Sequence, residues 1–170
     1  MKPALVIVSG VPGSGKTTLS QQLAARLFLP LVAKDPVKES LWRVDACESM
    51  FTALHAITAT HLDQGVGLVL EAAFHVGVSE AEVAPHLVRS TAVNVHCETP
   101  LAFDRFRDRT GAPDRHVCHP DAKRATEAEV WSERYGRMDL GIPALVVDTT
   151  DGYAPDLGAI VAWVEERIAC

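Results

Sequence analysis

Gly10-Val11-Pro12-Gly13-Ser14-Gly15-Lys16-Thr17 matches the pattern G-x-x-x-x-G-K-[ST] at every fixed position. An apolar run of strand length, Ala4–Ser9, precedes this segment, and an amphipathic helical pattern, Lys16–Leu27, follows it. Glycines let the backbone curl so that successive N–H groups point inward at phosphate oxygens. The positive end of the helix dipole adds to this attraction. We therefore expect a strand, a phosphate-binding loop (P-loop) and a helix.

The P-loop is expected to bind a nucleoside triphosphate, ATP or GTP. Lys16 should reach the β- and γ-phosphates, and the Thr17 hydroxyl should ligate Mg²⁺. The remaining phosphate contacts are expected from Gly10, Val11, Pro12, Gly13, Ser14, Gly15 and Thr18. A chance glycine-rich turn is the alternative, but the flanking strand and helix favour the P-loop. The motif leaves the reaction open, because GTP-driven switches, oligomeric motors and small kinases share it.

The rest of the chain alternates apolar runs of strand length with amphipathic helical stretches, as in a parallel sheet covered by helices. Further strands are expected at 29–34, 66–70, 91–97 and 143–147, and further helices at 36–44, 47–64, 79–87, 100–109, 125–136 and 155–169. Ser79 and Glu82 have the spacing of a capping box. With right-handed crossovers, these elements predict an α/β three-layer sandwich of five parallel strands, a single domain over residues 1–170.

Composition disfavours several other classes of protein. Of the 170 residues, 48% are hydrophobic and 22% charged, as in an ordinary globular domain. The formal net charge of −6 argues against a nucleic-acid or membrane partner. No apolar run approaches the roughly 20 residues of a membrane span. Four widely spaced cysteines without a C-x-x-C pair suggest a reducing, cytoplasmic location and no disulfide framework.

Three features separate the classes of P-loop protein. Oligomeric ATPases usually have a longer chain and an acidic pair at the end of the third strand, where this chain has Val69-Leu70-Glu71-Ala72. The guanine-reading motif Asn-Lys-x-Asp of switch GTPases is not found after the fourth strand. Asp35 follows the second strand, at the carboxyl edge that also carries the P-loop. There it could accept the proton of an attacking hydroxyl, or act as the N-cap before Pro36.

Basic residues gather in the predicted helix 100–109 and in the segment after it, and they are expected to form a lid over the triphosphate. Six of the sixteen lysines and arginines lie there: Arg105, Arg107, Arg109, Arg115, Lys123 and Arg124. Guanidinium groups stabilise the charge on a phosphoryl group in transfer, so Arg109 and Arg115 are candidate catalytic residues, and Arg105 and Arg109 candidate phosphate contacts. The irregular segment 110–122 could close over the site. The alternative is a solvated face with interleaved aspartates: Asp104, Asp108, Asp114 and Asp121.

Other polar residues are weaker candidates. Either Asp35 or Glu71, which ends the third strand, could bind Mg²⁺ through a water, and Glu71 could instead bind the acceptor or cap a loop. The segment 148–152 after the fifth strand is a candidate base site or a polar turn. His116 and His119 are expected to brace the lid or contact phosphate. Zinc is disfavoured because their spacing is tight and no second ligand pair lies nearby.

The phosphate acceptor is expected between Asp35, the helices of residues 36–64 and the segment after Glu71. Candidate acceptor contacts, which could equally be core residues, are Trp42, Phe51, His55, Phe74 and His75. An apolar pocket with few charges suits a compact polyhydroxy or aromatic metabolite. A nucleic-acid end would need a basic groove with stacking aromatics, and aromatic residues make up 6% of the chain.

The P-loop with Thr18, and the pair Lys34-Asp35 with Lys38 three residues on, resemble a group of P-loop kinases. The group includes polynucleotide 5′-kinases and chloramphenicol phosphotransferase. The stretches 105–109 and 115–120 are similar to the lid of bacterial proteins often labelled AAA-family ATPases. The resemblance implies the strand order 2-3-1-4-5, Asp35 as general base and a mobile arginine lid. Polynucleotide kinases generally carry arginine where this chain has Lys38, which disfavours a nucleic-acid end as acceptor.

The leading hypothesis is therefore a kinase that transfers the γ-phosphate of ATP or GTP, with Mg²⁺, to a hydroxyl of a small molecule. A polynucleotide 5′-hydroxyl kinase is the second hypothesis. A nucleotide-binding regulatory module with little transfer is the third, and its characteristic switch motifs are not found in the sequence.

Overall fold

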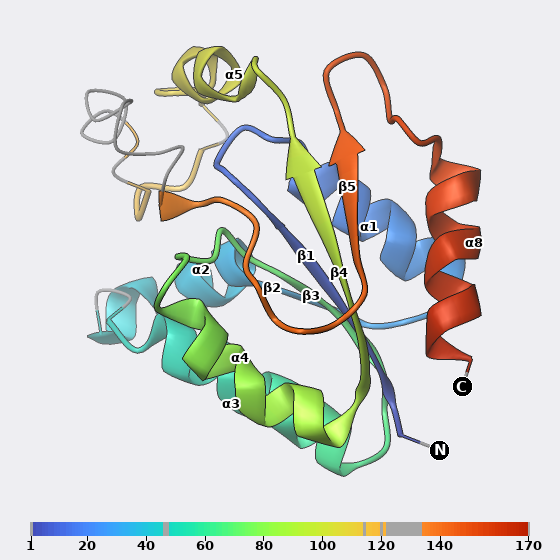
Figure 1. The fold of residues 1–170 in the computed structure, drawn as a ribbon. Coiled ribbons are helices and arrows are strands. Elements are labelled where there is room, and N and C mark those ends of the chain that lie inside the picture. The colour runs from blue at the N-terminus through green and yellow to red at the C-terminus, as the bar shows by residue number, and fades with distance from the viewer. Residues whose placement is uncertain (1, 46–47, 114, 120, 122–133, 170) are drawn as a thin grey trace.

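Five parallel strands form one sheet at the centre of the molecule (Figure 1). The computed structural model describes residues 2–45, 48–113, 115–119, 121 and 134–169. The strands are β1 (Ala4–Gly10), β2 (Leu31–Ala33), β3 (Leu68–Glu71), β4 (Thr91–Glu98) and β5 (Ala144–Asp148). Their order is β2-β3-β1-β4-β5, and every neighbouring pair is parallel. The predicted α/β fold and its strand order are confirmed.

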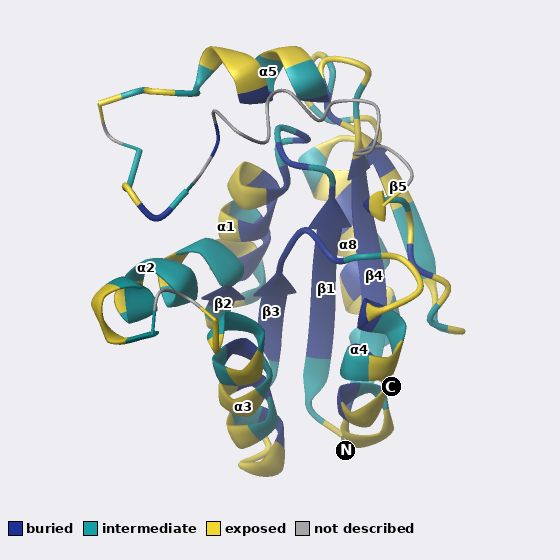
Figure 2. Ribbon diagram, turned by 90° about the vertical axis from the view of Figure 1, so that its left-hand side faces the viewer, coloured by how far each residue is buried: buried dark blue, intermediate teal, exposed yellow. Residues whose placement is uncertain are grey.

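Helices on both faces of the sheet complete three layers (Figures 1 and 2). One face packs against α1 (Lys16–Leu27) and α8 (Leu157–Ile168). The other packs against α2 (Lys34–Asp45), α3 (Met50–Asp63) and α4 (Ser79–Arg89). The short helix α5 (Ala102–Asp108) lies beyond the carboxyl ends of the strands, above the P-loop edge (Figure 1).

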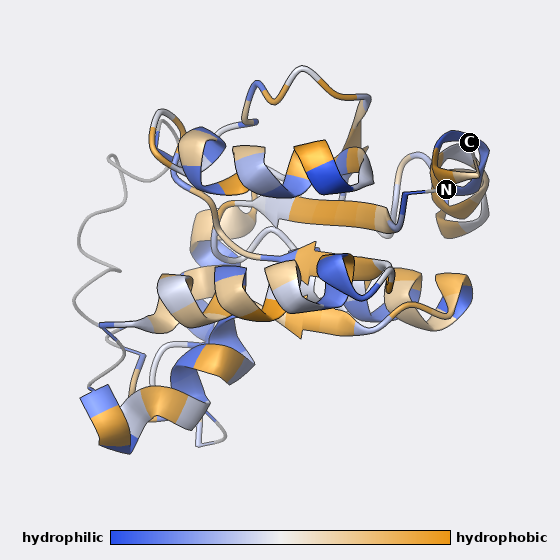
Figure 3. Cartoon of the chain, turned by 90° about the horizontal axis from the view of Figure 1, so that it is seen from below, coloured by the Kyte–Doolittle hydropathy of each residue, from blue (hydrophilic) through white to orange (hydrophobic). Residues whose placement is uncertain are grey.

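The alternation of side chains along the strands explains why both faces are covered. In β1, Val6 and Val8 pack towards α1 and α8, whereas Leu5 and Ile7 pack towards α3 and α4, and all four are fully buried. A strand that is apolar on both faces is typical of a parallel sheet with helices on each side. Seen from below, the hydrophobic strands lie between the two layers of helices (Figure 3).

The bounds of the second strand and of the helix after it differ from those predicted from the sequence, 29–34 and 36–44. β2 has three residues, and α2 begins at Lys34. Asp35 therefore lies inside the first turn of a helix, and not at the N-cap position that was its alternative role. Its carboxylate still projects from the carboxyl edge of the sheet, because the first turn of α2 directly follows β2.

The start of α4 differs from the predicted capping box. The N-cap residue is Val78, so Ser79 is already helical. The Ser79 hydroxyl accepts a hydrogen bond from the His75 N–H at 3.1 Å, and the Glu80 carboxylate accepts one from the Gly77 N–H at 2.8 Å. The prediction of a Ser79–Glu82 box was wrong because the tight turn before α4 has N–H groups of its own, and the nearest side chains satisfy them.

Several sequence predictions fall partly outside the described residues. Only the last three residues of the predicted helix 125–136 are described, and Asp114, Lys123 and Arg124 of the lid lie outside the described ranges. Cys97 and Cys118 are buried, whereas Cys47 and Cys170 are not described. Among the helices that are described, none is long and apolar enough to cross a membrane.

Candidate active site

The P-loop joins β1 to α1 in a backbone conformation that requires glycine. Gly13 has a φ of 88°, and a Cβ atom there would collide with the carbonyl group of Ala102 at the start of α5. Gly10 has a φ of 144°, and a Cβ atom there would lie 2.5 Å from the carbonyl oxygen of Cys97. A hydrogen bond from the Ser14 N–H to the Val11 carbonyl, 3.1 Å long, closes the turn. The loop therefore curls as the motif predicts, pressed against β4 and α5.

The phosphate contacts predicted from the P-loop motif lie on this loop or on the first turn of α1: Gly10, Val11, Pro12, Gly13, Ser14, Gly15, Lys16, Thr17 and Thr18. Lys16 is 9% exposed, and its Nζ donates to the Val11 carbonyl at 3.4 Å. The Ser14 hydroxyl is buried and has no hydrogen-bond partner among the described residues. An ammonium group, an unpaired hydroxyl and a curled run of amides fit a phosphate chain.

A pocket of about 20 Å³ beside the P-loop brings distant parts of the chain together. It is lined by Pro12, Lys16, Lys34, Asp35, Glu71, Ala73, Phe106, Arg109, Arg115, His119 and Asp121. All four candidate catalytic residues are in this set, contributed by the P-loop helix, α2, the end of α5 and the lid. The volume holds about one water molecule, so a phosphoryl group can enter only if the lid side chains move.

Asp35 lies among cationic groups. Its Oδ1 is 3.6 Å from Lys34 Nζ, and its Oδ2 is 3.5 Å from Arg115 Nη1. Burial alone would raise the pKa of Asp35, but Lys34, His119, Lys16 and Arg115 together outweigh this effect and lower the pKa to about 2. The carboxylate is therefore ionised at neutral pH and accepts hydrogen bonds only.

Arg115 connects Asp35 to a second carboxylate, Asp121. Its Nε and Nη2 atoms donate to the two oxygens of Asp121 at 2.6 and 3.3 Å, in the bidentate geometry typical of arginine. Asp121 is 3% exposed, so this pair is largely removed from water. The hydrogen bonds to Asp121 raise the pKa of Arg115 despite its burial. Arg115 is therefore anchored by Asp121 and presents its remaining edge to Asp35.

Arg109 ends α5 and points its guanidinium over the ring of Phe106, 4.9 Å from the ring centroid. Its Nε atom is buried and has no partner among the described residues. Burial and the proximity of Arg115 lower the pKa of Arg109, although an arginine keeps its charge at any physiological pH. The result is a desolvated cation beside Lys16, held by an aromatic ring and directed into the pocket.

Glu71 ends β3 and is 3% exposed. Its Oε1 lies 4.0 Å from Lys16 Nζ. Burial raises the pKa of Glu71, and the charge of Lys16 offsets part of the increase. Mg²⁺ usually takes one or two protein oxygens and keeps several waters. The oxygens of Thr17, Glu71 and Asp35 fit that preference, although no group of three acidic, histidine or cysteine side chains forms a metal site within the described ranges.

Arg105 has a different neighbourhood from Arg109. Its two terminal nitrogens donate to the carbonyl oxygens of Thr149 and Thr150, at 3.0 and 2.8 Å. The Thr149 hydroxyl in turn donates to the Ser14 carbonyl at 2.7 Å. Arg105 therefore ties α5 to the segment after β5, and this segment is itself tied to the P-loop. It is not among the residues that line the Asp35 pocket.

The two lid histidines have separate partners. His119 Nε2 lies 2.9 Å from Glu39 Oε1 on α2, and burial lowers the pKa of His119 although Glu39 opposes the decrease. His116 Nδ1 accepts a hydrogen bond from the Cys118 N–H at 3.2 Å. The two rings are 6.5 Å apart and nearly perpendicular. His119 therefore braces the lid against α2, as one of its two expected roles requires.

The candidate acceptor contacts lie elsewhere. Phe74 is in the core below the sheet edge, and Phe51 packs against the same core. His55 Nδ1 lies 3.0 Å from His86 Nε2, between α3 and α4. His75 packs edge-on against Tyr135. Neither these four residues nor Trp42 line the pocket around Asp35. Phe74 and Phe51 have instead the core role that was their alternative.

Asp121 and Glu39 belong to the site although their positions in the sequence do not predict it. The alternating charges of residues 104–121 indicate that lid arginines pair with aspartates, but not that Asp121 is the partner of Arg115. Glu39 has no local signal, since it is one of many charged residues on an exposed helix. Both become visible only when α2 and the lid come together.

The chain is similar to known proteins over most of its length. A family model described as an AAA domain matches residues 6–132, more than half of the chain. A solved protein from Chloroflexus aurantiacus, provisionally assigned as a kinase, is 31% identical, with a TM-score of 0.82 over 98% of this chain and 99% of that chain. No curated protein matches the sequence.

Two more distant structures are similar in fold alone. The APS kinase of Mycobacterium tuberculosis, solved in complex with AMPPNP and APS, is 17% identical, with a TM-score of 0.62 over 99% of both chains. A gluconokinase from Sinorhizobium meliloti is also 17% identical, with a TM-score of 0.61 over 98% of this chain and 94% of that chain.

Proposed function

Because this chain belongs to the AAA domain family and has the fold of P-loop kinases, we propose that it transfers the γ-phosphate of ATP or GTP to a hydroxyl group of a small molecule. The observation that carries the proposal is the pocket in which Asp35 meets Lys16, Arg109 and Arg115. A nucleotide-binding module without transfer would need the P-loop but not a carboxylate beside it. A kinase needs both.

In the proposed reaction, the P-loop amides and Lys16 hold the β- and γ-phosphates. When bound, Mg²⁺ adds positive charge to the same oxygens, and Thr17 with Glu71 or Asp35 would hold it directly or through water. The acceptor oxygen forms a bond to the γ-phosphorus while the bond to the β–γ bridging oxygen breaks. The hydroxyl proton passes to Asp35, and the nucleoside diphosphate leaves.

The low pKa of Asp35 determines when the proton moves. A carboxylate with a pKa of about 2 is a weak base towards an alcohol in the ground state. It can nevertheless hold the hydroxyl in line by accepting its hydrogen bond. The proton becomes acidic as the oxygen bonds to phosphorus, so Asp35 takes it late. Orientation is therefore the main contribution of Asp35 before the transition state.

The lid arginines supply charge where it develops. Arg109 is held over Phe106 and is already partly desolvated, so it loses little further hydration when it contacts the transferred phosphoryl group. Arg115 must first release Asp35, because its guanidinium contacts that carboxylate. Arg105 serves the nucleotide indirectly by holding Thr149 and Thr150, so that the segment 148–152 borders the base.

The charges around Asp35 indicate the kind of acceptor. Lys34, Asp121 and His119 line the pocket beside it, and Glu39 holds His119 from α2. A compact polyhydroxy compound can donate and accept hydrogen bonds with these groups, whereas an aromatic acceptor offers them few donors and acceptors. We therefore favour a hydrophilic polyol or sugar-like acceptor over the aromatic compounds considered from sequence.

A transfer screen tests the proposal. The full chain is incubated with Mg²⁺ and γ-labelled ATP or GTP, against polyols, sugars, aminoglycosides and a 5′-hydroxyl oligonucleotide. The proposal predicts a labelled small-molecule product. Label found in the oligonucleotide alone would support a polynucleotide kinase instead. Nucleotide binding without labelled product from any acceptor would contradict the assignment as a kinase.

A further inference from the structure

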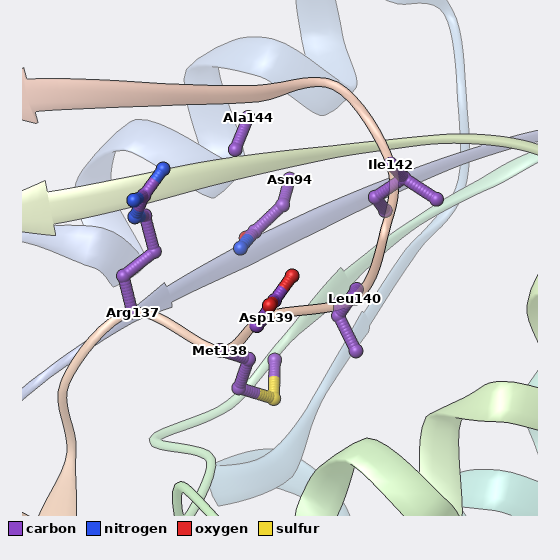
Figure 4. A pocket seen from close by; sticks show the side chains of 7 residues that line it. All are labelled: Asn94, Arg137, Met138, Asp139, Leu140, Ile142 and Ala144. Carbon is purple, nitrogen blue, oxygen red and sulfur yellow. The ribbon is translucent and has the colours of Figure 1, made fainter.

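A second pocket lies away from the P-loop, between β4 and the segment that leads from the lid into β5 (Figure 4). Its volume is about 220 Å³. It is lined by Asn94, Arg137, Met138, Asp139, Leu140, Ile142 and Ala144. In Figure 1 the segment of residues 134–143 crosses the face of the sheet beside α4. The pocket shares no lining residue with the pocket around Asp35.

The floor of this pocket is the buried side-chain amide of Asn94, whose N–H donors are not used in hydrogen bonds with described residues. Asn94 is 1% exposed, and its Oδ1 accepts a hydrogen bond from the Ser9 hydroxyl at 3.1 Å. Its Nδ2 has no hydrogen-bond partner among the described residues. The side chain of Asn94 extends from β4 towards the space between Arg137 and Asp139 (Figure 4). Buried donors are rarely left unpaired, so an acceptor atom from a ligand is expected here.

The network behind Asn94 fixes its orientation. The Ser9 hydroxyl also lies 2.9 Å from His96 Nδ1, and His96 is 2% exposed. These three polar side chains lie on the face of the sheet that elsewhere carries the apolar residues Leu5 and Ile7. Buried polar groups in place of apolar ones weaken a core. Their presence under a pocket therefore indicates a binding surface.

The rim carries one charge of each sign. Arg137 makes no ion pair with any described residue, and Asp139 Oδ1 accepts only a long hydrogen bond, 3.4 Å, from the Gly141 N–H. Both side chains are directed towards the pocket (Figure 4). A cation and an anion that face the same space without pairing suit a ligand with both charges. The guanidinium would bind a carboxylate, and Asp139 would bind an ammonium group.

The remaining wall is apolar and limits the size of the ligand. Met138 is buried, and Leu140 and Ile142 are half-buried. The volume of the pocket, about 220 Å³, is about eleven times that of the pocket around Asp35, about 20 Å³. This is below the roughly 300–1,000 Å³ of sites for drug-sized ligands, and it suits a molecule of about the size of a free amino acid.

We propose that the pocket formed by Asn94, Arg137, Asp139 and the apolar side chains of Met138, Leu140 and Ile142 binds a free α-amino acid with an apolar side chain. Its carboxylate binds the Arg137 guanidinium and the Asn94 amide. Its ammonium group binds Asp139, and its side chain packs against the apolar wall. This binding site involves no residue of the nucleotide pocket and is independent of the phosphotransfer reaction.

Ligand-observed NMR on the full chain without nucleotide tests the proposal, with the apolar amino acids leucine, methionine and valine as probes. We expect at least one of them to bind with a Kd below about 1 mM. Isocaproate, which lacks the amino group of leucine, and isopentylamine, which lacks its carboxylate, should each bind at least about tenfold more weakly. Absence of binding by all three amino acids, or equal binding of either analogue, would overturn the proposal.

Variants locate the site. Arg137→Gln and Asp139→Asn change exposed residues and should each weaken binding at least about tenfold without loss of fold. Arg26→Gln, on the exposed face of α1, is the matched control and should bind as the wild type does. Binding that persists unchanged in both pocket variants would place the amino acid elsewhere and refute the assignment.

Discussion

The Nη1 atom of Arg115 lies 3.5 Å from Oδ2 of Asp35, so the lid contacts the carboxylate that is proposed to receive the acceptor proton. The same guanidinium is held by Asp121, which is buried. Together these side chains close the pocket beside Lys16 to about 20 Å³. In the proposed reaction, the acceptor and the γ-phosphate separate Arg115 from Asp35, and the freed edge of the guanidinium then faces the phosphoryl group.

Replacement of Arg115 by glutamine should affect both catalysis and stability. Loss of the cation should lower kcat by about 10³-fold or more, as for other arginines that contact a transferred phosphoryl group. The buried Asp121 would lose its partner, which should lower the free energy of unfolding by on the order of 1–3 kcal/mol. Steady-state kinetics and urea denaturation measure the two effects.

A double variant separates these two roles of Arg115. Arg115→Gln with Asp121→Asn should recover most of the lost stability, because no unpaired charge remains, but none of the lost activity. Arg107→Gln is the matched control, since Arg107 is exposed and pairs with Asp104 on the surface of α5. A kcat that stays at the wild-type level in Arg115→Gln would exclude this arginine from the reaction.

Asp35 should make the fold sensitive to acid. Its pKa is lowered to about 2, so the folded chain binds the Asp35 proton less tightly than the unfolded chain does. Such a group stabilises the fold above its unfolded pKa of about 4, and this contribution is lost as the pH falls towards about 2. Between these values the wild type should lose more free energy of unfolding than Asp35→Asn. Equal losses in urea denaturation would contradict the lowered pKa.

Arg105 should act on nucleotide binding more than on chemistry. Its bonds to the carbonyls of Thr149 and Thr150 hold the segment proposed to border the base. Arg105→Ala should therefore raise the KM for the nucleotide by about tenfold while kcat changes less. Arg107→Ala, two residues away on α5, should leave both constants unchanged. If kcat falls in Arg105→Ala and KM does not, Arg105 contacts the transferred phosphate instead.

Lys16→Met should weaken nucleotide binding and keep the fold. The buried ammonium group is replaced by an apolar side chain of similar length, which relieves the cost of burying Lys16 while Glu71 can become protonated. Isothermal titration should show at least about a tenfold loss of affinity for ATP. Lys2→Met, at an exposed position before β1, is the control. Wild-type affinity in Lys16→Met would mean that Lys16 does not contact the phosphates.

The parts of the site that are formed by residues adjacent in the sequence could be predicted from the sequence. The P-loop is contiguous in sequence. Its conformation requires glycine at positions 13 and 10, where the Cβ atom of any other residue would collide with Ala102 and Cys97. The sheet followed from the alternation of apolar and helical patterns. Asp35 was expected at the carboxyl edge, because any residue directly after a parallel strand lies there. Its position inside α2 was not foreseen, since β2 has only three residues.

The parts that depend on long-range packing could not be predicted. The contact of Arg115 with Asp35 spans 80 residues, and nothing local distinguishes Arg115 from Arg105, which binds backbone carbonyls instead. The aromatic residues expected to contact the acceptor do not line the pocket for a similar reason. Phe74, for example, is of a residue type common in pockets, but it is buried in the core. The polar patch of Ser9, Asn94 and His96 also became visible only when β1 and β4 were paired.

The central claim is that Asp35 positions a hydroxyl group and takes its proton during phosphoryl transfer. Single-turnover transfer of the labelled γ-phosphate to the acceptor found in the screen tests this claim in wild type, Asp35→Asn and the surface control Asp104→Asn. We predict that Asp35→Asn binds the nucleotide at least as tightly as wild type but transfers phosphate about 10²–10⁴-fold more slowly, whereas Asp104→Asn behaves as wild type. An unchanged transfer rate in Asp35→Asn would contradict the account.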